Sequence, residues 1–403
     1  MTLAGISLAY MRARPLATAL NLLLLALGIA TICTLLLATR QIEERMVRDA
    51  RGIDLVVGAK GSPMQLILSA VYHLDAPTGN IALADALALQ RHSAVRRAIP
   101  LALGDSHHGF RIVGSSHDYP AHYGAALAEG ALWSKPMEAV LGAEAARATG
   151  LRSGATFPGA HGVAEGGAEH AGAPYTVVGV LAPTGSVIDR LVLTGVESVW
   201  AVHQHGEPGD DPQKLLDAMD EKDKELTALL IQYRSPLAAA TLPRHVNAQS
   251  ALQAASPAYE SARLFRMVGV GVEVLQAFGL VLVIASGLSV FIALLNALEE
   301  RRYDLAVMRM LGASRATLMG LMLVEGLALS FIGAVAGLAL GHLFAGALGM
   351  ALAAGQQPAV SGWVWSWDEL WLVALALGVG AAAALVPALR AYRTDVALVL
   401  AEG

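Results

Sequence analysis

Cysteine, aromatic residues and charge are all scarce in this sequence. The one cysteine, Cys33, lies inside an apolar stretch, so neither a disulfide framework nor a Cys-x-x-Cys metal knuckle can form within the chain. Only 15% of the 403 residues are charged and 5% aromatic, whereas 55% are hydrophobic. The formal net charge of −5 gives no support to nucleic-acid binding. This composition argues against an ordinary soluble protein and predicts an integral membrane protein with a soluble part.

The motifs of common enzyme classes are also missing. The nearest approach to a phosphate-binding loop, GAKGS at residues 58–62, lacks the G-x-x-x-x-G-K-[ST] spacing with which backbone amides wrap phosphates. Neither the H-E-x-x-H motif of metalloproteases nor the G-x-S-x-G motif of esterases occurs. We therefore predict that the chain is not an enzyme and binds no ATP or magnesium itself. If ATP is used, another chain must bind it.

Four stretches are long and apolar enough for helices that span a bilayer, which need about 20 mostly apolar residues. They cover residues 16–38, 274–298, 318–348 and 370–389. The first has the basic flank of a signal peptide, but its length and the lack of a small-residue cleavage site favour a membrane anchor. The fold class predicted is thus a membrane protein of four transmembrane helices.

The distribution of arginine predicts the orientation, because basic residues in short loops stay in the cytoplasm. Arginines precede the first stretch, lie between the second and third, and follow the fourth: Arg12, Arg14, Arg301, Arg302, Arg309, Arg315, Arg390 and Arg393. The loop between the third and fourth stretches has no Lys or Arg. It carries three tryptophans, and a fourth, Trp371, lies at the start of the fourth stretch, as expected at an outer interface. We expect a protein of the cell inner membrane with both termini in the cytoplasm.

This orientation predicts the following domain organisation. Residues 1–39 form a cytoplasmic N-terminus and transmembrane helix 1, and 40–266 a large mixed α/β domain in the periplasm, between helices 1 and 2. Then come transmembrane helix 2 (267–298), a cytoplasmic helix and turn (299–317), transmembrane helix 3 (318–348), a short outer loop (349–369), transmembrane helix 4 (370–389) and a cytoplasmic tail (390–403).

Within the large insertion, short segments rich in β-branched residues predict strands, and a charged helical stalk leads in from the membrane. Residues 135–150 are expected to form a helix that ends at a glycine. Residues 152–173, rich in Gly and Ala, and the polar residues 206–225 are expected to be exposed loops. From about residue 237 to 268 the chain is expected to be helical again.

Histidine is unusually frequent in the insertion, which holds all but one of the twelve. Neutral imidazole is a common ligand of zinc and copper, and paired or clustered histidines are compatible with such a site. The candidate ligands are His107, His108, His117, His122, His203 and His205. The alternative is that these are solvated loop histidines without a metal.

The apolar segment at residues 62–80 has two interpretations. If it forms a helix, one broad apolar face could contact the membrane surface or an apolar cargo, or it could be buried in the domain core. That face holds Met64, Leu66, Ile67, Val71 and Leu74.

The third apolar stretch contains an acidic residue, Glu325, whose charge is costly inside a membrane. It could accept protons, pair with a cation, or form a structural bond to a neighbouring helix.

The short connection EERRYDLAVMRMLGASR, residues 299–315, predicts a helix with one apolar face, on which Leu305, Met308 and Leu311 recur every three residues. Gly312 fits a left-handed helix stop, and Ser314 fits the cap of the next helix. Such a basic amphipathic helix could lie on anionic lipid. Alternatively, it could dock into a groove on a cytoplasmic partner.

The sequence ERRYDLAVMRMLGASR, residues 300–315, resembles the signature of ABC transporter permeases of the MacB/FtsX type. Three further segments, LAYMRARPLATALNLLLLALGIA, VEGLALSFIGAVAGLALG and VPALRAYRTDVALVLAEG, are similar to the helices of that family, and YTVVGVLAPTG is similar to its periplasmic core. The chain departs from MacB itself in lacking a fused nucleotide-binding domain.

This resemblance implies a dimeric permease that works by mechanotransmission with two copies of a separate cytoplasmic ATPase. The connection would then be the coupling helix, with Leu305, Met308, Arg309, Leu311 and Gly312 as docking residues. The permease could export a lipid, lipoprotein or small molecule or handle it in the periplasm. A periplasmic or outer-membrane partner is possible. Regulation of an extracytoplasmic hydrolase or sensor, and zinc or copper homeostasis, are the alternatives.

Overall fold

The computed structural model describes residues 3–161, 173–203, 212–248, 251–354 and 360–393. The chain divides into two compact units. Unit 1 comprises residues 1–42 and 268–403, and unit 2 comprises residues 43–267. Each unit is described by itself.

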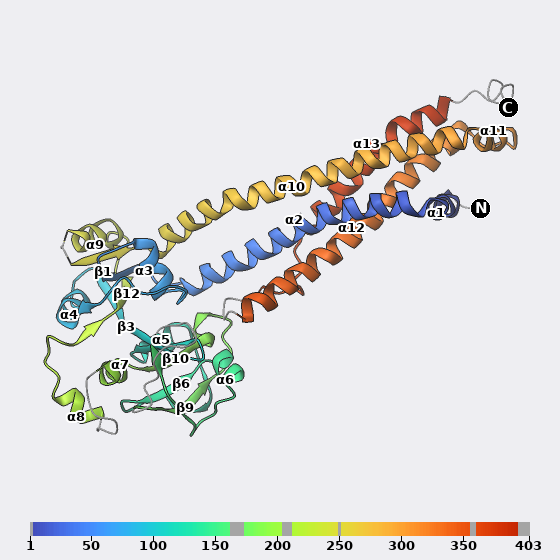
Figure 1. Cartoon of the computed structure of the whole chain (residues 1–403). Helices are drawn as coiled ribbons and strands as arrows, with labels where there is room; N and C mark the ends of the chain where they lie inside the picture. Colours follow the sequence, from blue (N-terminus) through green and yellow to red (C-terminus); the bar gives the residue numbers. More distant parts are fainter. Residues whose placement is uncertain (1–2, 162–172, 204–211, 249–250, 355–359, 394–403) are drawn as a thin grey trace. The chain divides into compact units, whose positions relative to one another are not determined.

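Unit 1 is a bundle of long helices (Figure 1). Among the described residues, four helices are long and apolar enough to cross a membrane. They are α2 (Pro15–Asp49), α10 (Pro257–Glu300), α12 (Arg315–Ala354) and α13 (Glu369–Arg393). The four predicted spans are confirmed, and each helix extends beyond its predicted apolar stretch at both ends. Two shorter helices, α1 (Leu3–Ala13) and α11 (Arg302–Met310), lie at one end of the bundle (Figure 1).

Small residues let the helices of unit 1 approach closely. Toward α2, α12 presents a glycine at every fourth position: Gly333, Gly337 and Gly341. A Cβ atom added at Gly337 would lie 2.7 Å from the Ile29 Cβ, so no larger residue fits without moving the helices apart. This spacing puts the glycines on one face of α12 and is a common means of helix association in membranes.

The helices α2 and α10 also touch along a line of small and polar residues. A Cβ atom at Gly28 would lie 2.9 Å from the carbonyl oxygen of Gly279. Seven residues earlier on α2, the Asn21 carbonyl oxygen accepts a hydrogen bond of 3.2 Å from the Ser286 hydroxyl, and its side-chain oxygen accepts one from the Ser289 hydroxyl. Hydrogen bonds of this kind join helices where no water competes.

Unit 2 is built on one large mixed sheet. Its described residues form an 11-stranded sheet with the order β13-β1-β12-β3-β4-β10-β6-β9-β5, while β7 pairs with β9 and β8 with β3. The strands are β1 (Leu55–Ala59), β3 (Val95–His107), β4 (Phe110–Ser115), β5 (Leu127–Gly130), β6 (Glu138–Leu141), β7 (Thr156–Phe157), β8 (Ala160–His161), β9 (Tyr175–Leu181), β10 (Leu191–Gly195), β12 (Ala228–Tyr233) and β13 (Leu252–Ala255). A separate pair joins β2 (Ile81–Ala82) and β11 (Glu225–Leu226). Most neighbours are antiparallel, but β4–β10 and β6–β9 are parallel.

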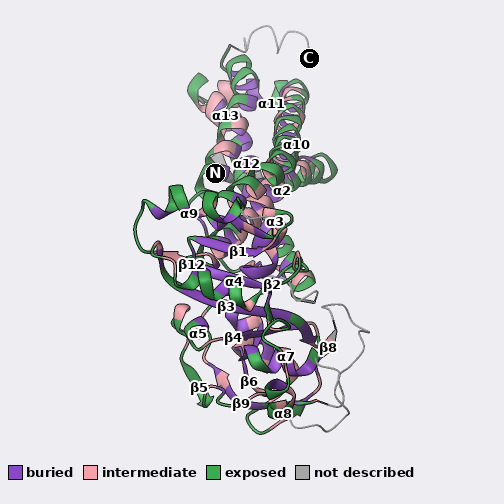
Figure 2. Cartoon of the chain, turned by 90° about the vertical axis from the view of Figure 1, so that its left-hand side faces the viewer, coloured by how far each residue is buried: buried purple, intermediate pink, exposed green. Residues whose placement is uncertain are grey.

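Short helices cover this sheet and complete two apolar cores. They are α3 (Pro63–Ala70), α4 (Leu83–Gln90), α5 (Asp118–His122), α6 (Ala143–Thr149), the 3₁₀ turn η1 (Val187–Arg190), α7 (Val196–His203), α8 (Pro212–Asp217) and α9 (Ala238–Asn247). One core surrounds Leu55, Leu229 and Ile231, and the other surrounds Ile112, Leu141 and Tyr175. Figure 2 shows the central strands buried between the more exposed helices. The predicted mixed α/β domain between the first and second spans is confirmed.

Three local predictions for unit 2 need correction. The expected helix at 135–150 contains the strand β6, which pairs with both β9 and β10, and only α6 is helical. Gly150 ends α6 in the left-handed conformation, with φ 72°. Phe157, expected in an exposed loop, is 2% exposed and stacks on Tyr175, whereas residues 162–172 lie outside the described part. The segment expected to be helical from 237 to 268 contains the strand β13 between α9 and α10.

Candidate functional site

The connection between α10 and α12 consists of one short helix and a tight turn. Gly312 follows α11 with φ 101°, a conformation that strains residues with a side chain. Its N–H donates to the Arg309 carbonyl at 3.1 Å, and the Ala313 N–H donates to the Met308 carbonyl at 3.0 Å. This pair of bonds is a Schellman cap. The Ser314 hydroxyl then accepts the Thr317 N–H at 3.1 Å and caps α12, so the turn is rigid.

The inner face of α11 packs on the bundle. Leu305 is 0% exposed and belongs to a cluster with residues from α10, α12 and α13: Leu298, Leu318, Leu321, Met322, Ala388 and Ala391. Met308 packs against the same cluster and is partly buried. A side chain that fills a core does not also reach a partner protein. Leu305, predicted as a docking residue, is therefore a core residue that holds α11 in place.

The outer face of α11 and the following turn carry large exposed side chains. The exposed fractions are 58% for Tyr303, 62% for Met310 and 84% for Leu311. Gly312 is also exposed, and Arg309 is partly buried. Of the predicted docking residues, Leu311 and Gly312 thus lie on the open surface. Tyr303 and Met310 are exposed as well but were not among the predicted residues, because the three-residue spacing of the apolar stripe selects the face that packs inward.

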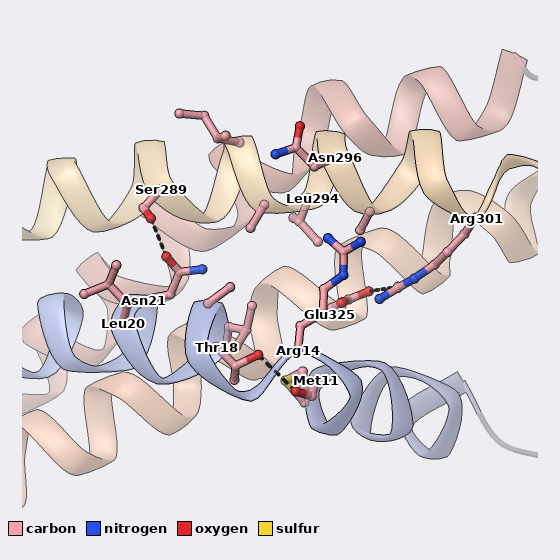
Figure 3. Close-up of a pocket in the computed structure, with 15 residues that line it drawn as sticks. Met11, Arg14, Thr18, Leu20, Asn21, Ser289, Leu294, Asn296, Arg301 and Glu325 are labelled. Carbon is pink, nitrogen blue, oxygen red and sulfur yellow. Dashed lines mark hydrogen bonds and ion pairs between the residues drawn. The ribbon is translucent and has the colours of Figure 1, made fainter.

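A cavity of about 230 Å³ is lined by residues of α1, α2, α10 and α12 and by Arg301 just before α11 (Figure 3). The Arg301 guanidinium, directly before α11, donates to the Glu325 carboxylate of α12 at 3.3 Å. Both side chains are buried, with exposed fractions of 9% and 7%. Arg14, which also lines the cavity, forms an ion pair with Glu300 at the end of α10. Glu325 therefore pairs with a cation and bonds to a neighbouring segment, as two of its predicted alternatives state.

Comparison with known proteins agrees with this architecture. The sequence model of the MacB-like periplasmic core domain matches residues 18–247, which is more than half of the chain, and that of the FtsX-like permease C-terminal domain matches residues 277–396. The chain belongs to the MacB/FtsX family of ABC transporter permeases. No curated protein matches it.

Two solved structures are similar to the MacB-like part of this permease. The periplasmic region of MacB from Actinobacillus actinomycetemcomitans is 13% identical, with a TM-score of 0.34, and the match covers 54% of this chain and 97% of that one. The extracellular domain of the noncanonic ABC-type transporter YknZ from Gram-positive bacteria is also 13% identical, with a TM-score of 0.30, and the match covers 50% and 98%.

The candidate metal ligands of the MacB-like domain contact other groups in the structure. His107 Nδ1 bonds to the Pro158 carbonyl at 3.0 Å, His117 Nε2 to the Trp133 carbonyl at 2.9 Å, and His203 Nδ1 to the Val199 carbonyl at 2.8 Å. His108 packs edge-on against His107, and His122 Nδ1 lies 3.3 Å from the Gln232 amide. His205 lies outside the described residues. Over the described ranges, these histidines form no group of three metal-ligating side chains.

The apolar segment predicted at residues 62–80 contains the helix α3, capped by Ser62. Leu66, Ile67 and Val71 are at most 1% exposed and thus belong to the interior of unit 2. Of the five side chains predicted to contact lipid or cargo, Leu74 is 38% exposed and Met64 is partly buried. Only these two could contact lipid or cargo, because the other three are buried in unit 2.

Proposed function

We propose that this permease is driven by a separate cytoplasmic ABC ATPase that docks on α11 and the turn after it. The single observation that carries the proposal is the exposed apolar group of Tyr303, Met310 and Leu311. These side chains sit on a helix whose opposite face is fixed by Leu305 in the bundle. An exposed apolar anchor on a rigid support is typical of an interface hot spot.

The rigid turn favours docking over loose contact with lipid. A helix that only rests on lipid needs no fixed end, whereas Gly312 and the caps around it hold Leu311 in one position. A preorganised side chain loses less conformational freedom on binding, so more of its contact free energy appears as affinity. The exposed arginines Arg302 and Arg315 flank this surface and suit an acidic groove on the ATPase.

Force from such a partner would reach the far side of the membrane through continuous helices. The 44 residues of α10 correspond to about 66 Å, roughly twice the ~30 Å of the hydrocarbon core. The helix α2, with 35 residues, is also longer than a span requires. Movement of α11 would therefore act on the periplasmic unit without a substrate pathway through the bilayer. The permease would use this movement to export a lipid, lipoprotein or small molecule or to handle it in the periplasm.

The proposed assembly is a homodimer in the cell inner membrane with two ATPase subunits. The arginines at α1, α11 and the end of α13 support a cytoplasmic position for the end of the bundle that holds α1 and α11, because basic residues are retained in the cytoplasm. The exposed tryptophans Trp363, Trp365, Trp367 and Trp371 support an outer interface at the other end of the bundle.

Co-purification with the ATPase tests the docking surface. Leu311→Asp places a charge at the centre of the apolar group and should abolish association without changing the amount of permease in the membrane. Leu237→Asp is the matched control, because Leu237 is 73% exposed in unit 2. ATPase retained by Leu311→Asp, or lost equally from both variants, would contradict the proposal.

A further inference from the structure

Three metal-ligating side chains from three helices of unit 1 lie close together. They are Cys33 of α2, His342 of α12 and Glu369 at the start of α13, and their ligand atoms all lie within 4.8 Å of one another. Cys33 and Glu369 are 0% exposed, and the His342 side chain is 21% exposed. We propose that this cluster binds a zinc-like divalent cation, a property that goes beyond docking of an ATPase.

The hydrogen bonds of His342 point one ring nitrogen at this cluster. Its Nδ1 lies 2.7 Å from the carbonyl oxygen of Gly362, which can only accept, so Nδ1 carries the proton. In the neutral ring Nε2 then holds the free lone pair, and it lies 2.9 Å from a carboxylate oxygen of Glu369. Two acceptors so close need a proton or a cation between them. Metal-bound histidines commonly show this arrangement, in which the other N–H is fixed by a carbonyl.

The charges of the cluster suit a divalent cation in an apolar bundle. Thiolate at Cys33 and carboxylate at Glu369 would together neutralise the two positive charges of the ion, so no net charge would be buried. An uncompensated ion at this depth would carry a large desolvation penalty.

The surrounding residues hold the ligands in place. The second carboxylate oxygen of Glu369 accepts the Ser366 N–H at 2.8 Å, and Trp365 stacks on the His342 ring with the planes 6° apart. A Cβ at Gly341 would lie 2.8 Å from the Cys33 sulfur, so the glycine keeps room for this thiol. Ligands supported in this way need little rearrangement to bind a metal.

The combination of ligands selects the type of metal. One sulfur, one nitrogen and one oxygen ligand suit zinc, which accepts all three and leaves a fourth position for water. Magnesium and calcium require mainly oxygen ligands, and monovalent copper prefers sulfur to carboxylate. Cobalt(II) usually occupies zinc sites and, unlike zinc, has a visible spectrum.

Cobalt(II) titration of the full-length permease in detergent tests the site. Because Cys33 is the sole cysteine, a thiolate-to-cobalt charge-transfer band can arise from this residue alone. We expect the band in the native protein, its loss on addition of one equivalent of zinc, and its absence in Cys33→Ser. His342→Gln and Glu369→Gln should each weaken binding at least tenfold. His203→Gln, in unit 2, should leave the band and the affinity unchanged.

Several outcomes would overturn the proposal. If the native protein shows no charge-transfer band, Cys33 does not bind cobalt. If His342→Gln and Glu369→Gln both bind cobalt with native affinity, the three residues do not form the site. A thermal unfolding curve of each variant, recorded without metal, separates loss of ligation from loss of fold. If Cys33→Ser unfolds at the native temperature and still titrates zinc with native affinity, the metal binds elsewhere. ATPase association in Cys33→Ser should stay native, so failure of this site and failure of the α11 docking surface can be told apart.

Discussion

Arg301 and Glu325 form a buried ion pair that joins the start of α11 to the first third of the membrane helix α12, with 3.3 Å between Nη1 and Oε2. Both residues line the cavity between α1, α2, α10 and α12. Leu305, on the next turn, adds apolar packing against the same helix. The position of α11 is thus set by two independent contacts with the bundle, one polar and one apolar.

Glu325→Gln should lower the thermal unfolding midpoint of the permease in detergent. Removal of the Glu325 charge breaks the buried pair with Arg301, and breaking a buried pair in this way costs about 3–5 kcal/mol. Glu273→Gln, at an exposed position on α10, is the matched control and should be neutral. The double variant Arg301→Leu/Glu325→Leu should recover part of the loss, because it removes both charges. A midpoint shift equal to that of Glu273→Gln would contradict the structural role of the pair.

Leu305→Ala and Leu311→Ala should have opposite effects on stability and binding. Truncation of Leu305, which is 0% exposed, leaves a cavity in the bundle and should cost about 2–5 kcal/mol. Leu311, 84% exposed, should change the free energy of unfolding by less than about 0.5 kcal/mol but weaken ATPase association. Thermal unfolding and co-purification, measured on the same preparations, check both. Equal stability of the two variants would be inconsistent with the described packing of α11.

Gly312→Ala should destabilise the turn after α11. A side chain at φ 101° is strained, and we expect a loss of about 1 kcal/mol together with weaker ATPase association. Gly269→Ala is the control: it lies within α10, where an added Cβ meets nothing within 4 Å, and alanine there should stabilise the helix by up to about 1 kcal/mol. The two unfolding midpoints should therefore move in opposite directions, and a shift of both in the same direction would speak against the left-handed cap.

His73 should make unit 2 less stable in acid. Burial, with Arg111 and Arg190 nearby, lowers the pKa of His73 well below its usual 6.5. Below pH 6.5 the unfolded chain binds a proton that the folded one does not, so stability is full above this pH and falls as pH decreases, by up to about 1.4 kcal/mol per unit.

His73→Gln has no titrating ring and should reduce this acid-dependent loss. Its amide can still reach toward the Tyr119 hydroxyl, which lies 2.8 Å from Nε2 of the histidine. His245→Gln, at an exposed position, should keep the native pH dependence. The measurement is the unfolding midpoint of each protein between pH 5 and 8; identical slopes for His73→Gln and the native chain would refute the assignment.

The membrane helices could be predicted because their signal is local: about 20 apolar residues in a row need no tertiary information. The strand β6 could not, since its residues favour helix and only pairing with β9 and β10 makes it a strand. Tertiary pairing overrides propensity in such segments.

The sequence predicted where the short helix α11 lies, but not which way its apolar face points. The stripe of Leu305 and Met308 identified an amphipathic helix, yet periodicity does not tell whether its apolar face meets the bundle or a partner. The pairing of Glu325 with Arg301, 24 positions apart, depends on how α11 folds back on α12. Cys33, His342 and Glu369 are farther apart still, and no spacing motif connects them.

The contact line between α2 and α10 has a mechanical consequence. Asn21 holds α10 through Ser286 and Ser289, and seven residues further along α2 the backbones meet at Gly28 and Gly279. A slip of one residue, about 1.5 Å, would break the hydrogen bonds and drive a side chain into the space of a glycine. The two helices therefore keep a fixed register, and an axial displacement of one helix displaces the other by the same distance.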